Sequence, residues 1–206
     1  MPLMTEAKKS DQTRQRILDT GRSLVLRHGF SGVGLSRILS ESGVPKGSFY
    51  YYFASKEAFG TAMLADYVEG YLTRVDALIA GPGRAGDKLD SFWDAWLSQS
   101  SAPGIASACL VVKLGSEVAD LSDPMRDTLD QGVDALVNRI AQLLRHGAQD
   151  GSVRAVDDPE TTARMLYAKW LGAAVLAKLA RSDAPLRMAR AETSVQLSRT
   201  RDQLPT

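Results

Sequence analysis

Apolar residues recur at spacings of three and four along almost the whole chain of 206 residues. This spacing is typical of an amphipathic α-helix, whereas a half-buried strand alternates apolar and polar residues. No run with convincing strand alternation interrupts the pattern. The sequence therefore predicts an all-α fold, in which helices pack against helices.

Breaks in this pattern divide the chain into separate helices. Glycine, proline and capping residues mark the breaks, because their backbone geometry or side-chain oxygens start and stop helices. The expected helices are 13–28, 35–42, 46–53, 56–79, 88–100, one that starts near 107, 124–149, 159–181 and 184–201. We expect Gly29 to end the first helix, and Ser55, Asp123 and Asp158 to cap later ones. Residues 1–10 are polar, which favours a mobile arm.

Three short helices in the first fifty residues, with a glycine-containing turn between the second and third, form a helix-turn-helix pattern. In the third helix Phe49 and Phe53 share one face, which must be buried, whereas Tyr50, Tyr51 and Tyr52 point to several sides. Packing against neighbouring helices cannot account for all three tyrosines. Phenol hydroxyls beside a lysine and a glycine suit contact with a phosphate backbone.

The run from Ile38 to Phe59, which contains Gly-Val-Pro-Lys-Gly-Ser-Phe-Tyr-Tyr-Tyr-Phe, resembles the helix-turn-helix of the tetracycline-repressor (TetR) family of regulators. The resemblance implies an all-helical homodimer with two domains in each chain. Residues 1–56 would form the three-helix DNA-binding domain with its N-terminal arm, and residues 57–206 the larger helical domain for ligand binding and dimerisation. The implied partners are a pseudo-palindromic double-stranded DNA operator and a small-molecule effector.

The same resemblance assigns residues to the DNA. Lys46 and Gly47 would begin the recognition helix, with Lys46 near base edges. The residues expected at the DNA are Arg37, Lys46, Gly47, Ser48, Tyr50, Tyr51, Tyr52 and Lys56. Gly34 departs from the family pattern, which usually has a capping Thr or Ser there, so Ser36 or Arg37 is expected to replace that hydroxyl at the phosphate.

Large planar side chains mark a candidate effector site in the C-terminal half. Trp93, Trp96, Tyr167 and Trp170 supply such surfaces on otherwise apolar helix faces. Plain core packing is the alternative for each of them.

Cys109 is the only cysteine of the chain. If Ser107 caps its helix, Cys109 lies in the first turn, where the helix dipole and Lys113, one turn further on, favour the thiolate. The segment Ala-Cys-Leu-Val-Val-Lys around it resembles a TetR branch that senses acrylate-like and other electrophilic compounds with this cysteine. That resemblance places Lys178 near the thiol. The alternatives are an inert buried cysteine with a non-covalent effector, and a snorkelling Lys178.

Small residues on the penultimate helix favour close approach of another helix. Gly172, Ala173, Ala174 and Ala177 could help form a four-helix dimer interface with the last helix, as in the family. Packing within one chain is the alternative. A pure dimerisation adaptor and a thiol enzyme are also possible, but no resolving cysteine and no recognisable histidine partner support an enzyme.

The formal net charge of +1 conceals two opposite parts. Residues 1–56 hold nine basic and four acidic residues, whereas the other 150 hold 16 basic and 20 acidic ones. A basic head on an acidic body orients the molecule toward phosphate. We expect no cofactor and no metal site, and, because the sequence has no signal or membrane-spanning run, a cytoplasmic protein that does not act at a membrane.

Overall fold

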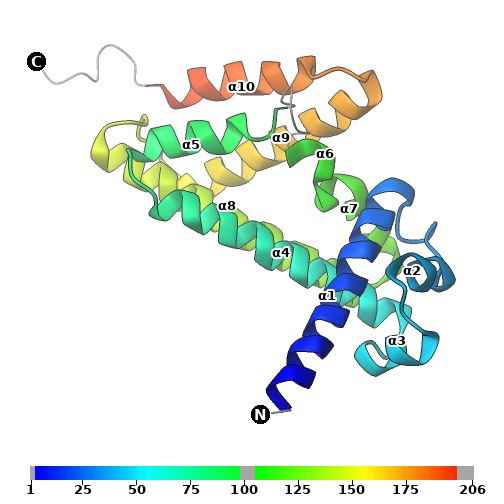
Figure 1. Cartoon of the computed structure of the whole chain (residues 1–206). Coiled ribbons are helices and arrows are strands. Elements are labelled where there is room, and N and C mark those ends of the chain that lie inside the picture. Colours follow the sequence, from blue (N-terminus) through cyan, green and yellow to red (C-terminus); the bar gives the residue numbers. More distant parts are fainter. Residues whose placement is uncertain (1–2, 98–104, 199–206) are drawn as a thin grey trace, which may run out of the picture. The chain divides into compact units, whose positions relative to one another are not determined.

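A computed structural model describes residues 3–97 and 105–198, which form ten helices and no strand (Figure 1). The prediction of an all-α fold is confirmed. The helices are α1 (Leu3–His28), α2 (Leu35–Ser42), α3 (Lys46–Tyr52), α4 (Lys56–Ala80), α5 (Ala85–Asp94), α6 (Ile105–Ala108), α7 (Leu110–Leu121), α8 (Asp123–Asp150), α9 (Pro159–Ala180) and α10 (Ala184–Leu197). None of them combines the length and the apolarity that a membrane crossing requires, as far as the described residues go.

The chain divides into two compact units. The first contains the residues up to Glu69 together with Lys113–Asp130, and the second contains Gly70–Val112 and the residues from Gln131 onward. The sequence prediction instead separated two domains between residues 56 and 57. Two long helices, α4 and α8, and the shorter α7 each contribute to both units, so a single cut in the sequence does not describe this division.

The first unit is built around an aromatic cluster below α3. The rings of Phe49, Phe53 and Phe59 lie 5.3–5.7 Å apart and are buried, as predicted for Phe49 and Phe53. Gly43 ends α2 with φ 64°, a left-handed conformation that glycine adopts without steric cost. The chain can therefore reverse tightly and present α3 beside α2.

Helix α1 is longer than predicted and corrects the expectation of a mobile arm. It begins at Leu3, ten residues before the predicted start. Thr13 lies inside the helix, where its hydroxyl donates a hydrogen bond of 3.0 Å to the carbonyl of Lys9 one turn earlier. Polar residues without glycine or proline extend this helix as readily as they would form an arm.

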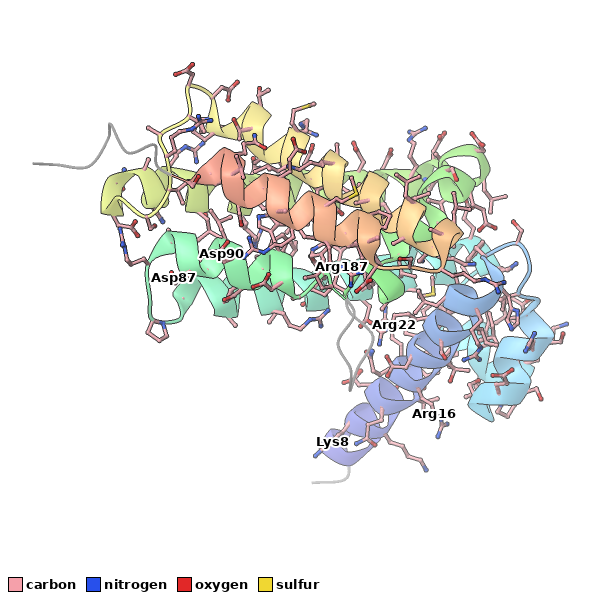
Figure 2. The ribbon with its side chains drawn as sticks, turned by 90° about the horizontal axis from the view of Figure 1, so that it is seen from above. Lys8, Arg16, Arg22, Asp87, Asp90 and Arg187 are labelled. Carbon is pink, nitrogen blue, oxygen red and sulfur yellow. The ribbon has the colours of Figure 1, made fainter. Side chains whose placement is uncertain are left out.

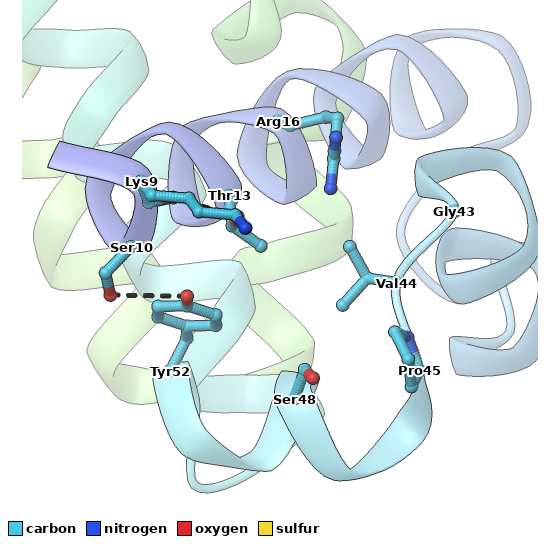
Figure 3. A pocket seen from close by; sticks show the side chains of 9 residues that line it. All are labelled: Lys9, Ser10, Thr13, Arg16, Gly43, Val44, Pro45, Ser48 and Tyr52. Carbon is cyan, nitrogen blue, oxygen red and sulfur yellow. Dashed lines mark hydrogen bonds between the residues drawn. The ribbon is translucent and has the colours of Figure 1, made fainter. Parts of the chain in front are cut away.

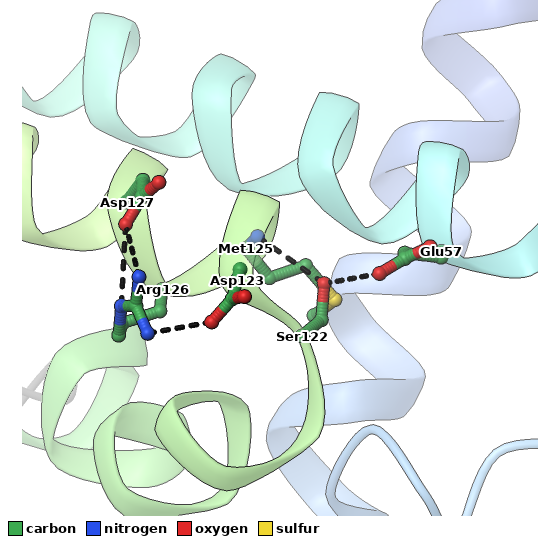
Figure 4. Close-up of polar contacts among 6 residues, drawn as sticks. All are labelled: Glu57, Ser122, Asp123, Met125, Arg126 and Asp127. Carbon is green, nitrogen blue, oxygen red and sulfur yellow. Dashed lines mark hydrogen bonds and ion pairs between the residues drawn. The ribbon is translucent and has the colours of Figure 1, made fainter.

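The start of α8 also differs from the prediction. Asp123 is its first residue, and the hydroxyl of Ser122 accepts the hydrogen bond of the Met125 N–H at 3.4 Å (Figure 4). The same hydroxyl donates to a carboxylate oxygen of Glu57 at 2.6 Å. Asp123 instead pairs with Arg126 at 2.6 Å. Ser122 is buried and has access to both partners, which explains why it replaces Asp123 as the cap.

Other predicted boundaries agree with the structure. Gly29 follows α1 with φ 78°, Ser55 accepts a hydrogen bond from the Ala58 N–H at 2.9 Å, and Asp158 caps α9 through the N–H groups of Glu160 and Thr161.

Helix α5 differs from the prediction, because it occupies 85–94 rather than 88–100. Residues 98–100 and 199–201, which belong to two of the predicted helices, lie outside the described residues.

The second unit has a tryptophan-rich core. Trp93 and Trp170 stack with ring centroids 4.9 Å apart and an angle of 14° between the planes. Trp96 packs edge-on against Tyr167 at 5.9 Å. These residues come from α9 and from α5 with the turn that follows it, and all are buried. The indole N–H of Trp170 donates to the hydroxyl of Thr193 on α10 at 3.1 Å, which links the core to the last helix.

Candidate functional site

Helix α3 presents its polar face to solvent in the first unit. Tyr51 is 77% and Tyr50 48% exposed, and Lys46 and Gly47 are exposed as well. The buried ring of Phe49 holds the opposite face of the helix against the core. An aromatic ring so far exposed contributes little to packing. The exposed residues are therefore accessible to a ligand, and their contact with DNA stays a prediction.

Two further residues of α3 line a cleft of about 370 Å³ between α1 and the turn before α3 (Figure 3). Ser48 lies at one wall, and Tyr52 lies at the rim, where its phenol oxygen accepts a hydrogen bond from the Ser10 hydroxyl at 3.2 Å. The other lining residues are Lys9, Ser10, Thr13, Arg16, Gly43, Val44 and Pro45. None of the lining residues from α1 was among those expected at the DNA.

Two predicted DNA contacts have partners within the protein. The ammonium of Lys56 donates to the carbonyl of Phe30 at 3.0 Å and lies 4.7 Å from the centre of its ring. Burial lowers the pKa of Lys56, and the negative charge of Glu117 offsets part of this effect. Arg37 donates to Glu41 at 3.0 Å. Any contact of Lys56 or Arg37 with phosphate has to compete with these interactions.

Glu117 on α7 holds the turn between α1 and α2 in place by hydrogen bonds. Its carboxylate accepts hydrogen bonds from the N–H of Phe30 at 3.1 Å and of Ser31 at 2.7 Å. Partial burial alone would raise the pKa of Glu117, but these hydrogen bonds and the charge of Lys113 lower it below the ordinary value. Sequence reasoning missed this residue, because one acidic residue in an amphipathic helix carries no sign of a partner 87 positions away.

Cys109 lies in the second unit, immediately before the first residue of α7, and is 3% exposed. Ser107 belongs to α6 and Cys109 precedes α7, so the condition for the thiol to lie in the first turn of a helix capped by Ser107 is not met. The buried phenols of Tyr71 and Tyr167 lie close enough to Cys109 for a negative charge on its sulfur to raise their pKa. Burial raises the pKa of both tyrosines, and a charge on Cys109 raises it further, so both hydroxyls keep their protons at neutral pH. Sequence reasoning missed Tyr71.

The four predicted aromatic residues lie in the same buried core as this thiol. Trp93, Trp96, Tyr167 and Trp170 belong to the same buried cluster as Cys109. The indole N–H of Trp93 is buried and has no hydrogen-bond partner among the described residues, whereas the indole of Trp96 interacts with the phenol of Tyr71. Buried donors without a partner are rare in native cores. The cluster therefore combines apolar planes with polar groups that a ligand could use.

The two predicted lysines are placed differently. The positive charge of Lys113 lowers the pKa of Glu117, which lies one turn further along α7. Lys178 lies in the last turn of α9 and is exposed. A role for either lysine at the thiol stays a prediction. No group of three or more histidine, cysteine or acidic residues that could hold a metal ion occurs in the described part of the chain.

Comparisons with known proteins identify the family. Residues 17–63 match the model for bacterial regulatory proteins of the tetR family, and residues 85–193 match the tetracyclin repressor-like C-terminal domain. The chain is 42% identical to the HTH-type transcriptional repressor NemR of Escherichia coli strain K12, over 87% of this chain and 90% of NemR. It is 32% identical to the transcriptional regulator AcuR of Cereibacter sphaeroides, over 87% of this chain and 83% of AcuR.

A solved structure agrees with this relationship. The crystal structure of the reduced form of E. coli NemR superposes with a TM-score of 0.85 and 39% identity, over 92% of this chain and 99% of that one. The described helices, the helix-turn-helix and the sequence matches all support the same assignment. The chain belongs to the tetR family of bacterial regulatory proteins and is a DNA-binding transcriptional regulator.

Proposed function

We propose that the chain is a homodimeric repressor that leaves its operator when an electrophile reacts with Cys109. The buried cluster of Cys109, Tyr71 and Tyr167 is the observation that carries this proposal. Relatives such as NemR are named transcriptional repressors, and one NemR structure is described as a reduced form, which supports regulation through a thiol.

The reaction that suits this cluster is addition to an α,β-unsaturated carbonyl compound. The thiolate sulfur of Cys109 forms a bond to the β-carbon, and the electron pair of the carbon–carbon double bond moves toward the carbonyl oxygen. The protonated phenols of Tyr71 and Tyr167 can donate hydrogen bonds to this developing oxyanion. The proton released by the thiol ends on the α-carbon, so the adduct is neutral and no oxidant is required.

Dimerisation through α9 and α10 is supported by an exposed apolar stripe. On α9, Met165, Leu176 and Leu179 are 64%, 56% and 76% exposed, and on α10, Met188 and Val195 are 72% and 75% exposed. Large apolar side chains at helical spacing on two adjacent helices are typical of a face that a second copy covers. Two recognition helices related by a two-fold axis would then read two half-sites roughly 34–36 Å apart.

Helix α7 offers a path from the thiol to the DNA-binding unit. Cys109 directly precedes Leu110, the first residue of α7, and Glu117 follows about two turns later. Since Glu117 holds the backbone of Phe30 and Ser31, a shift of α7 caused by an adduct would disturb the turn that leads into α2. The dimer would then favour a spacing of its recognition helices that does not fit the operator.

Catalysis by the thiol is not proposed. Both histidines, His28 and His146, are exposed, whereas Cys109 is buried. An enzyme of this class needs a base within hydrogen-bond reach of its nucleophile. A non-covalent effector is the second candidate, because the unsatisfied indole N–H of Trp93 can bind a polar ligand without any reaction of Cys109.

Mass spectrometry of the intact protein tests the covalent proposal. After incubation with methyl vinyl ketone, we expect one adduct per chain, located on Cys109, and none in Cys109→Ser. Butan-2-one, the saturated ketone, serves as the matched control and should leave the mass unchanged. An unmodified Cys109 in folded protein would exclude the covalent route and favour the non-covalent effector.

A further inference from the structure

The cleft between α1 and the turn before α3 has a composition that suits an anion. Lys9 and Arg16 of α1 and Ser48 of α3 line it, and no acidic residue does. Figure 3 shows the Arg16 side chain reaching toward the space that Val44 and Ser48 border from the other wall. Two like charges at one cleft repel each other, and an anion bound between them would relieve this repulsion.

Three other arginines of the first unit have acidic partners. Arg22 pairs with Asp19 and Asp66 at 2.6 and 3.2 Å. Likewise, Arg27 and Arg37 pair with the same glutamate, Glu41, at 3.6 and 3.0 Å. In the described part of the chain, by contrast, no acidic group lies within ion-pair distance of Lys9 or Arg16.

Position relative to α3 indicates which anion the cleft accepts. Pro45 and Ser48 belong to the wall of the cleft and also flank Lys46, the first residue of the recognition helix. In helix-turn-helix proteins the recognition helix enters the major groove, and polar side chains beside it contact the sugar–phosphate backbone. The cleft shares Ser48 with the recognition helix and adjoins its first residue, so it lies beside the groove, where one DNA strand passes.

We infer that this cleft binds a phosphodiester of the operator backbone, held by Lys9 and Arg16 from α1 and by the Ser48 hydroxyl from α3. Tyr52, fixed by its hydrogen bond with Ser10, closes one side of the site. The contact positions the protein on the duplex and carries no sequence information. It extends the DNA interface from α3 to α1, beyond the residues that the motif identifies.

The salt dependence of DNA binding measures this contact. Each phosphate neutralised on B-DNA contributes a slope of about −0.9 to the plot of log affinity against log salt concentration. With two chains on the operator, Arg16→Ala should make the slope shallower by about 1.8. The probe is a duplex from the region upstream of the gene, followed by fluorescence anisotropy at several salt concentrations.

Two variants keep this measurement specific. Lys8→Ala removes an exposed lysine that neighbours Lys9 on α1 but does not line the cleft, and should change the slope clearly less than Lys9→Ala (Figure 2). Arg16→Lys keeps the charge and should retain most of the slope. Arg16 is exposed, so none of these changes should lower the melting temperature, which circular dichroism checks.

Neutral backbone linkages locate the phosphate directly. Duplexes with a single methylphosphonate at successive positions should reveal one linkage per half-site whose neutralisation weakens the wild type but not Arg16→Ala. Independent, additive effects at every position would overturn the proposal, as would equal slopes for Lys8→Ala and Arg16→Ala. Inorganic phosphate that binds in an Arg16-dependent way without such a linkage would instead indicate a free-anion site, and would also overturn it.

Discussion

The carboxylate of Glu117 accepts a hydrogen bond of 2.7 Å from the backbone N–H of Ser31, although 86 positions separate the two residues. A second bond, from the N–H of Phe30, makes the contact bidentate. On the other side of the same peptide segment, Lys56 donates to the carbonyl of Phe30. The turn that leads into α2 is thus held by side chains from α4 and α7.

Replacing Glu117 with Gln should destabilise the first unit by about 1.5 kcal/mol at pH 7, the lower end of the range for hydrogen bonds to a charged group, since the residue is partly exposed. Chemical denaturation measures this loss. Asp120→Asn, which changes an exposed acid on the same helix, is the matched control and should have little effect.

The effect of Glu117 should also depend on pH. The pKa of its carboxyl is lowered in the folded protein from the ordinary value of 4.5. A lowered folded-state pKa contributes stability that is fully present above the unfolded value and is lost as the pH falls through the folded one. The difference between wild type and Glu117→Gln should therefore be constant above about pH 6 and shrink below pH 4.5. A difference that grows at acidic pH would contradict this contact.

Replacing Tyr51 with Phe should weaken operator binding without destabilising the fold. The ring is 77% exposed, so loss of its hydroxyl should change the stability by less than about 0.5 kcal/mol. Loss of one phosphate hydrogen bond in each of two chains, at about 0.7 kcal/mol each, corresponds to roughly tenfold weaker binding. Lys46→Ala should have a similar or larger effect. Anisotropy titrations with unchanged melting curves test both variants, and normal affinity in both would contradict the assigned interface.

Replacing Gly172 with Glu should separate the dimer into folded monomers. A Cβ atom at Gly172 meets nothing within 4 Å in its own chain, so the substitution does not strain the monomer. In a dimer, by contrast, it would put a charge into the proposed apolar interface of α9 and α10. Sedimentation velocity at micromolar concentration measures the mass. Gly47→Glu, at another glycine with open space around it, is the control and should leave the oligomeric state unchanged.

Local patterns in the sequence were sufficient for most of the fold and for the exposed part of the DNA interface. The spacing of Phe49 and Phe53 defined the buried face of α3 and left Tyr51 exposed, because helical geometry alone decides both. The cap at Asp158 was equally predictable, since its oxygens bind N–H groups two and three residues away.

Interactions between distant segments could not be predicted in this way. Glu117, Tyr71 and the cationic residues of α1 gain their roles only when α7, α4 and α1 are packed against other helices. Ser122 replaced Asp123 as a helix cap because it is buried beside Glu57, which is distant in the sequence. Polar residues of α1 continued a helix where an arm was expected, since nothing in their local chemistry separates the two outcomes.

The most direct test of the account is operator binding by wild type and Cys109→Ser in the presence of methyl vinyl ketone. The probe is a duplex from the region upstream of the gene, and butan-2-one is the unreactive control. We predict that methyl vinyl ketone releases the wild type from the DNA, that Cys109→Ser stays bound, and that butan-2-one releases neither. Equal release of both proteins, or retention of a wild type that carries the adduct, would contradict a sensor role for Cys109.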